Sequence, residues 1–149
     1  MPAYFHKGRA TVDVIFIEPS FPANQREFAR ALHSVGARVI GIGERPKSSL
    51  DDGLRQWLTH YEEIGNVTDE GQLEKAVRWL QARPGVKIER LEAVVEAHVM
   101  AAARVRERCG IPGTSVQTAF LCRDKPAMKE ALRKAGVPCA QSIGSSDPA

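Results

Sequence analysis

A lysine stands near the start of a predicted helix late in this 149-residue sequence, where the helix dipole disfavours positive charge. The helix begins in the stretch RDKPAMKEALRKAGVP, in which Asp124 can cap the first turn and Pro126 suits its first positions. Arg123 and Lys125 place two positive charges beside this cap. A bound anion would relieve the misfit. The N–H groups of the helix start and the Lys125 ammonium together suit a phosphate.

A second interpretation of the same residues needs no ligand. Asp124 can offset the neighbouring cations, and both can be hydrated at an exposed helix end, where the misfit costs only about 0.3–1 kcal/mol. Physical arguments alone favour this interpretation over a phosphate site. The helix itself is well supported, because one of its faces is consistently apolar and comprises Ala127, Met128, Ala131, Leu132 and Ala135.

The elements that would position this lysine begin with a strand–helix–strand unit. Residues 11–17, TVDVIFI, are apolar on both faces apart from Asp13, which is typical of a strand covered by helices on both sides. The next helix has Asn24 and Glu27 as a predicted capping box. Residues 37–43 form the following strand, so we expect an α/β fold with a parallel sheet flanked by helices. Phe28, Ala31, Leu32 and Val35 line one face of this helix.

The alternation of strand and helix patterns continues less regularly toward the middle of the chain. It predicts a short helix at 48–58, a weaker third strand at 60–66 and a fourth strand that ends near Leu91. Between the last two strands, Thr68 is the predicted cap of a helix. Its predicted inward face comprises Leu73, Ala76, Val77 and Leu80.

A break separates these elements from the lysine-bearing helix. A helical pattern runs from Glu96 to Arg108, and residues 109–115, CGIPGTS, are then dense in glycine and proline. We place a domain boundary there. The chain is therefore expected to consist of a sheet domain, 1–112, and a short helical segment, 113–149.

The loops after the first two strands are where a parallel sheet would bind a ligand. The first, EPSFPAN, begins with Glu18 and lacks the glycine-rich turn of a dinucleotide site, which disfavours a nicotinamide or flavin dehydrogenase. The second contains only GxG, a weak signal. Glu18 could contact a ligand or simply accept hydrogen bonds from nearby backbone amides, and we favour the second role.

Other classes of protein are disfavoured by composition and by missing motifs. The sequence has no P-loop, no GxSxG and no aspartate placed as in a phosphorelay receiver. Its 21 Lys and Arg against 18 Asp and Glu are too balanced for nucleic-acid binding, and its three cysteines and four histidines show no metal spacing. No apolar run is long enough for a membrane, and no signal peptide is recognised, so a cytoplasmic location is expected.

The stretch GIPGTSVQTAFLCRDKPAMKEALRKAGVPCA resembles the start of an ATP-grasp domain, as in biotin carboxylases, carbamoyl-phosphate synthases and carboxylate–amine ligases. The similarity rests on the Gly-Ile-Pro-Gly segment at 110–113, the triplet Arg123-Asp124-Lys125 and the exit Ala135-Gly136-Val137-Pro138. The upstream part, including VIFIEPSFPANQREFARALHSVGARVIGIGERP, resembles the Rossmann-like domain that precedes ATP-grasp in such ligases. The resemblance thus covers nearly the whole chain.

The resemblance implies roles for individual residues. Lys125 would reach a nucleotide phosphate, and Glu96 would match a glutamate near the substrate side. ATP and magnesium would serve the full-length ligase, which forms an acyl phosphate that an amine or related nucleophile attacks. The sequence stops before the family's second lysine, adenine-binding hinge and metal-binding acids.

The chain alone is therefore expected to be inactive, to hold no metal and to bind no cofactor tightly. Its expected partner is the remainder of the ATP-grasp domain, or a separate chain that supplies it, and a homodimer is possible. Neither nucleic acid nor a membrane is expected as a partner. The alternative is a non-catalytic module that uses the Rossmann-like sheet to bind a small anion or a protein.

Overall fold

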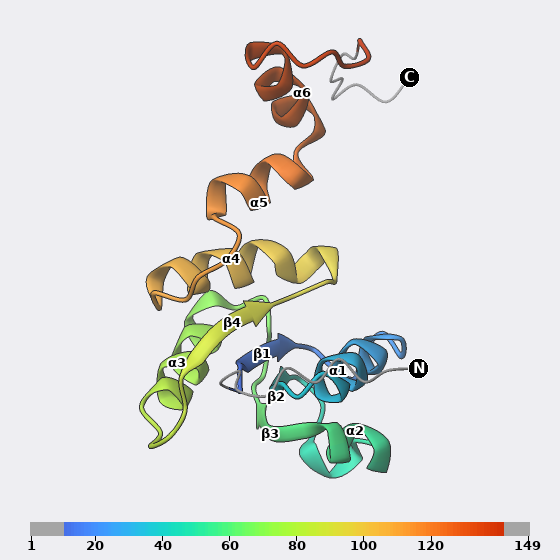
Figure 1. The fold of residues 1–149 in the computed structure, drawn as a ribbon, viewed down its shortest axis with the longest axis vertical. Coiled ribbons are helices and arrows are strands. Elements are labelled where there is room, and N and C mark those ends of the chain that lie inside the picture. Colours follow the sequence, from blue (N-terminus) through green and yellow to red (C-terminus); the bar gives the residue numbers. More distant parts are fainter. Residues whose placement is uncertain (1–10, 142–149) are drawn as a thin grey trace, which may run out of the picture.

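A computed structural model describes residues 11–141, which form a compact sheet domain and a helical extension (Figure 1). Along the chain the elements are β1 (Asp13–Ile17), α1 (Gln25–Ser34), β2 (Arg38–Gly43), the 3-10 turn η1 (Lys47–Ser49), α2 (Asp52–Trp57), β3 (Leu58–Glu63), α3 (Glu70–Gln81), β4 (Ile88–Glu92), the 3-10 turn η2 (Glu96–His98), α4 (Val99–Arg108), α5 (Val116–Arg123) and α6 (Lys125–Lys134).

The four strands form one parallel sheet in the order β3-β2-β1-β4. This confirms the predicted α/β fold with a parallel sheet flanked by helices. The fourth strand ends at Glu92, one residue beyond the predicted end, and the third begins at Leu58, two residues before the predicted start. All five residues of β1 are buried, as expected for a strand covered on both faces.

Helices cover the two faces of the sheet and create two apolar cores. On one face, α3 and α4 pack against Ile15 and Ile17 of β1 and against Leu91 of β4. On the other face, α1 and α2 pack around Phe16 of β1 and Tyr61 of β3. The alternation of side chains along β1 thus assigns successive residues to opposite cores.

Asp13, the one polar residue of β1, is buried and paired. The Arg38 guanidinium donates to both of its carboxylate oxygens, and the Lys87 backbone N–H donates to Oδ2 at 2.9 Å. Burial alone would raise the pKa of Asp13, but these hydrogen bonds hold it below its ordinary value. The carboxylate therefore ties the beginnings of β1, β2 and β4 together.

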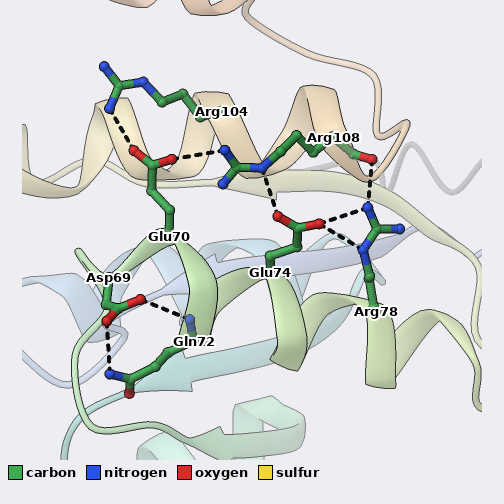
Figure 2. Close-up of polar contacts among 7 residues, drawn as sticks. All are labelled: Asp69, Glu70, Gln72, Glu74, Arg78, Arg104 and Arg108. Atoms are coloured by element: carbon green, nitrogen blue, oxygen red, sulfur yellow. Dashed lines mark hydrogen bonds and ion pairs between the residues drawn. The ribbon is translucent and has the colours of Figure 1, made fainter.

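Ion pairs join α3 to α4 at the surface (Figure 2). Glu70 accepts from Arg104 at 2.6 Å and from Arg108 at 2.9 Å. Glu74 bridges Arg108 and Arg78, each with a contact of 2.7 Å. These hydrogen bonds lower the pKa of both glutamates, Glu70 chiefly through Arg104 and Glu74 chiefly through Arg78.

The apolar face of α1 named from the sequence is largely exposed. Phe28 is 44% exposed, Val35 is 79% exposed, and Ala31 is also at the surface. The helix is turned so that a different set of residues lies toward the sheet; this set comprises Gln25, Ala29 and Leu32. The two faces share Leu32, and the partly exposed Phe28 ring lies 6.0 Å from the ring of buried Phe16.

Two predicted helix starts differ from the structure in their capping. Asn24 is the N-cap residue of α1, as predicted, but its side chain makes no capping hydrogen bond. Thr68 donates its hydroxyl and its backbone N–H to Asn66 Oδ1, so it belongs to the preceding turn. Asp69 caps α3 instead, accepting the Gln72 N–H at 3.0 Å.

The last two helices follow the strands and helices that form the two apolar cores. α5 packs against α4, and α6 lies beyond α5 on the side away from the sheet (Figure 1). Ala119 is the only buried residue of α5, and α6 has none. No helix within residues 11–141 is long and apolar enough to cross a membrane.

Candidate functional site

The carboxyl edge of the sheet is the first place to examine, because ligands bind there in parallel α/β folds. The chain leaves β1 toward β2 on one side, whereas β4 lies on the other side of β1. The loop after β1 and the loop after β4 therefore diverge at this edge. They carry Glu18 and Gln25 on the β1 side, and Glu96 and His98 on the β4 side.

Glu18 follows β1 directly and is 5% exposed, in the left-handed backbone region with φ of 52°. Its carboxylate accepts from Ser20 Oγ at 2.8 Å and from the Glu44 backbone N–H at 2.9 Å. Its own N–H donates to the Ile42 carbonyl at 2.7 Å. Burial first, and then the nearby Glu18 and Glu63 carboxylates, raise the pKa of Tyr61. Glu18 thus links the ends of β1 and β2, and its role toward a ligand stays a prediction.

His98 and Gln25 were not singled out in the sequence. His98 Nδ1 and Gln25 Oε1 are buried and have no hydrogen-bond partner within residues 11–141. Burial lowers the pKa of His98, while the carboxylates of Glu18 and Glu44 oppose that change. Burial therefore favours the neutral imidazole. A neutral ring with an unused nitrogen can exchange a hydrogen bond or a proton with a ligand. Only the folded chain reveals this environment of His98. Glu18, Gln25, Glu44 and His98 lie far apart in the sequence.

Glu96 is tied to the Arg-Asp-Lys triplet. Its Oε1 accepts from Arg123 Nε at 2.9 Å, across 27 positions of sequence. Glu96 begins the turn after β4, and Arg123 ends α5. One of the two cations at the start of α6 is therefore already paired. Lys125 is exposed and makes no ion pair with any residue in the part of the chain that the structure describes.

The start of α6 offers fewer backbone donors than the sequence suggested. Asp124 caps the helix, as predicted, with Oδ1 accepting from the Ala127 N–H at 2.8 Å. Pro126 has no N–H, and the Met128 N–H donates to the Asp124 carbonyl at 2.8 Å. An anion at this helix start would therefore depend mainly on the Lys125 ammonium.

The structure thus brings some of the predicted site residues together and leaves others apart. Glu96 contacts the triplet, but no hydrogen bond or ion pair among residues 11–141 joins Lys125 to Glu18. No group of three or more His, Cys, Asp or Glu within that range could hold a metal ion. A pocket of about 350 Å³ lies elsewhere, at the end of β3 beside α3, and none of the predicted site residues lines it.

Comparisons with known proteins inform the fold. No protein-family model matches the chain, and no curated protein matches it either. Two solved structures are similar: phosphoribosylglycinamide synthetase from Anaerococcus prevotii, at 14% identity and a TM-score of 0.63, and L-amino acid ligase from Bacillus licheniformis, at 16% identity and a TM-score of 0.65. The matches cover 85% and 87% of this chain but only 30% and 32% of those structures. The chain has the fold of about a third of each.

Proposed function

We propose that this chain is the front part of an ATP-dependent ligase of the ATP-grasp class. The proposal rests on the extent of the fold likeness. Residues 1–112, the predicted sheet domain, are about 75% of the 149-residue chain. Matches that cover 85–87% of the chain must therefore include part of residues 113–149. The likeness to two ATP-grasp ligases therefore extends into the segment that carries the Arg-Asp-Lys triplet.

The proposed reaction is activation of a carboxylate as an acyl phosphate, followed by attack of an amine or a related nucleophile. Lys125 would contribute positive charge toward a nucleotide phosphate, because its ammonium is exposed and unpaired among the described residues. Glu96 would hold Arg123, and Glu18 and His98 would lie at the substrate side of the sheet.

Magnesium does not fit the residues described, because they include no cluster of metal-binding side chains. The metal and the rest of the nucleotide site would have to come from further chain or from a partner that supplies the remainder of the ATP-grasp domain. We therefore propose that the 149-residue chain neither hydrolyses ATP nor transfers its γ-phosphate. Its affinity for ATP should be no better than about millimolar, because a single exposed charge is screened by salt.

The test is a titration of the 149-residue chain with Mg-ATP, followed by calorimetry and by amide chemical shifts. We expect weak, saturable shifts at the start of α6 that disappear in Lys125→Ala and persist in Lys129→Ala, a matched change one turn later on the same helix. Steady phosphate release, or tight binding that Lys125→Ala abolishes, would contradict the expected inactivity of the chain alone.

The alternative is a non-catalytic module that binds a small anion or a protein at the carboxyl edge of the sheet. The unpaired polar atoms of His98 and Gln25 are the observation that favours it. The same titration distinguishes the two functions. Shifts at the ends of β1 and β4, unchanged in Lys125→Ala, would support the binding module over the ligase.

A further inference from the structure

Arg106 of α4 is a buried cation that joins three segments. Arg106 is only 5% exposed. Nε and Nη2 donate to the Leu91 carbonyl of β4 at 3.0 and 2.7 Å, and Nη1 donates to the Thr114 carbonyl at 2.5 Å. The Glu92 carboxylate lies 3.6 Å from Nη2. A buried guanidinium is strongly unfavourable unless its donors are used, so these bonds fix the loop before α5 on the sheet domain.

The loop from α4 to α5 follows the Arg106 side chain closely. A Cβ atom built on Gly113 would lie 2.6 Å from Arg106 Cδ and 2.8 Å from Nε, so only glycine allows this approach. Ile111 is buried in the core between the sheet and α4, and its N–H donates to the Arg106 carbonyl at 2.9 Å. The glycine- and proline-rich break is therefore packed in place.

α5 is attached to the sheet domain at both of its ends. At its start, the Val116 N–H donates to Glu107 Oε1 of α4 at 2.7 Å. In its middle, Ala119 is buried. At its end, Arg123 donates to Glu96 at 2.9 Å. Two hydrogen bonds, one at each end of α5, thus hold it to α4 and to the turn η2.

α6 is attached very differently. Within the described chain, the hydrogen bonds and ion pairs made by residues 125–141 all stay within residues 124–141; they are the Asp124 cap, the Lys134–Glu130 pair and short-range contacts of Arg133, Val137 and Cys139. None of the residues of α6 is buried. α6 packs against α5, but no hydrogen bond or ion pair among the described residues joins the two helices. Asp124 connects them in an extended conformation with φ of −91° and ψ of 96°.

We infer that Arg106 is a positioning residue that makes α5 part of the sheet domain, so that the joint with the following segment lies at Asp124. This joint is one residue before Lys125 and twelve positions beyond the boundary after residue 112 expected from the sequence. Rotation about the Asp124 backbone would move Lys125 relative to the fixed Glu96–Arg123 pair. The position of this joint does not depend on whether the chain uses ATP.

The test measures distances between pairs of nitroxide labels by electron double resonance on the 149-residue chain. Cys109 and Cys139 are replaced by alanine, and Lys75→Cys places one label on the exposed side of α3. The second label is either native Cys122 on α5 or, in a Cys122→Ala background, Arg133→Cys on α6. We expect a narrow distance distribution to α5 and a broad one to α6. Equal widths for the two pairs would overturn the inference.

Arg106→Met tests the role of the guanidinium, because it keeps the length of the side chain without its donors. We expect the distribution to α5 to broaden toward that of α6, while hydrogen exchange of the β1 amides is unchanged. Arg104→Met, a change of an exposed arginine on the same helix, should leave the distance distribution narrow.

If Arg106→Met does not fold, the double variant Glu96→Gln with Glu107→Gln, which changes two exposed residues, should give partial broadening. A folded Arg106→Met with a narrow distribution, or no broadening in the double variant, would contradict the proposed role.

Discussion

The helices α4 and α6 are both ten residues long and both end in a basic turn, yet they are used very differently. α4 buries five of its residues, among them Ala101 and Val105, against the sheet and α3. α6 buries none and contacts mainly α5 (Figure 1). An amphipathic pattern therefore forms a helix with an apolar face, but the burial of that face depends on the partner that the fold provides.

The largest expected contrast between the two regions comes from deleting a leucine side chain. Leu91 is fully buried in the core that contains Val105, so Leu91→Ala should lower the free energy of unfolding by about 2–5 kcal/mol. Leu132→Ala, on α6, should change it by less than about 0.5 kcal/mol. Urea unfolding followed by the fluorescence of Trp57 and Trp79, both in the sheet domain, measures each effect. Equal losses would show that α6 shares the stability of the core.

A smaller contrast concerns two helix caps of the same kind. Asp69 accepts the Gln72 N–H at 3.0 Å, and Asp124 accepts the Ala127 N–H at 2.8 Å. Asp69→Ala should lower the global free energy of unfolding by about 0.5–2 kcal/mol. Asp124→Ala should instead speed hydrogen exchange in α6 alone and leave the urea midpoint unchanged. A shift of that midpoint in Asp124→Ala would mean that α6 unfolds together with the sheet domain.

The smallest expected contrast is in the response to acid. Hydrogen bonds from Arg104 and Arg78 lower the pKa values of Glu70 and Glu74 in the folded state. Their stabilising contribution is present above the ordinary glutamate pKa of 4.5 and is lost as the pH falls through the lower folded-state values.

Two variants on matched ion pairs test this acid response. Glu74→Gln should make the urea midpoint less dependent on pH in that range. Glu130→Gln, whose glutamate has its pKa lowered by Lys134 on α6, should leave the pH dependence as it is. Equal effects of the two substitutions would contradict the separation of the two helices.

The sequence predicted the sheet well because its signals are long and consistent. β1 and β2 are largely apolar, and most of the helix patterns are bounded by glycine or proline. The buried face of α1 could not be predicted from spacing alone, because residues 25, 29 and 32 and residues 28, 32 and 35 satisfy the same helical spacing. The neighbours of the helix decide between these faces, and they placed Ala29 inside and Phe28 outside.

The site was less predictable than the fold. The Asp124 cap followed from local sequence rules, because a cap and its helix are adjacent in the chain. The Glu96–Arg123 pair and the unpaired nitrogen of His98 depend on contacts between segments far apart in the sequence. No local pattern encodes such contacts. The ligand roles of Lys125, Glu96 and Glu18 remain predictions.

The proline at the start of α6 has a consequence for selectivity among anions. Where several helix N–H groups surround a phosphate, their directions match its tetrahedral oxygens and so discriminate by shape. Pro126 and the Asp124 cap leave Lys125 as the main donor there, and a flexible ammonium attracts any anion of suitable charge. If the proposed function is right, this helix responds to charge alone. The discrimination of a nucleotide from a carboxylate or a sulfate then belongs to the groups on the opposite side of the bound molecule.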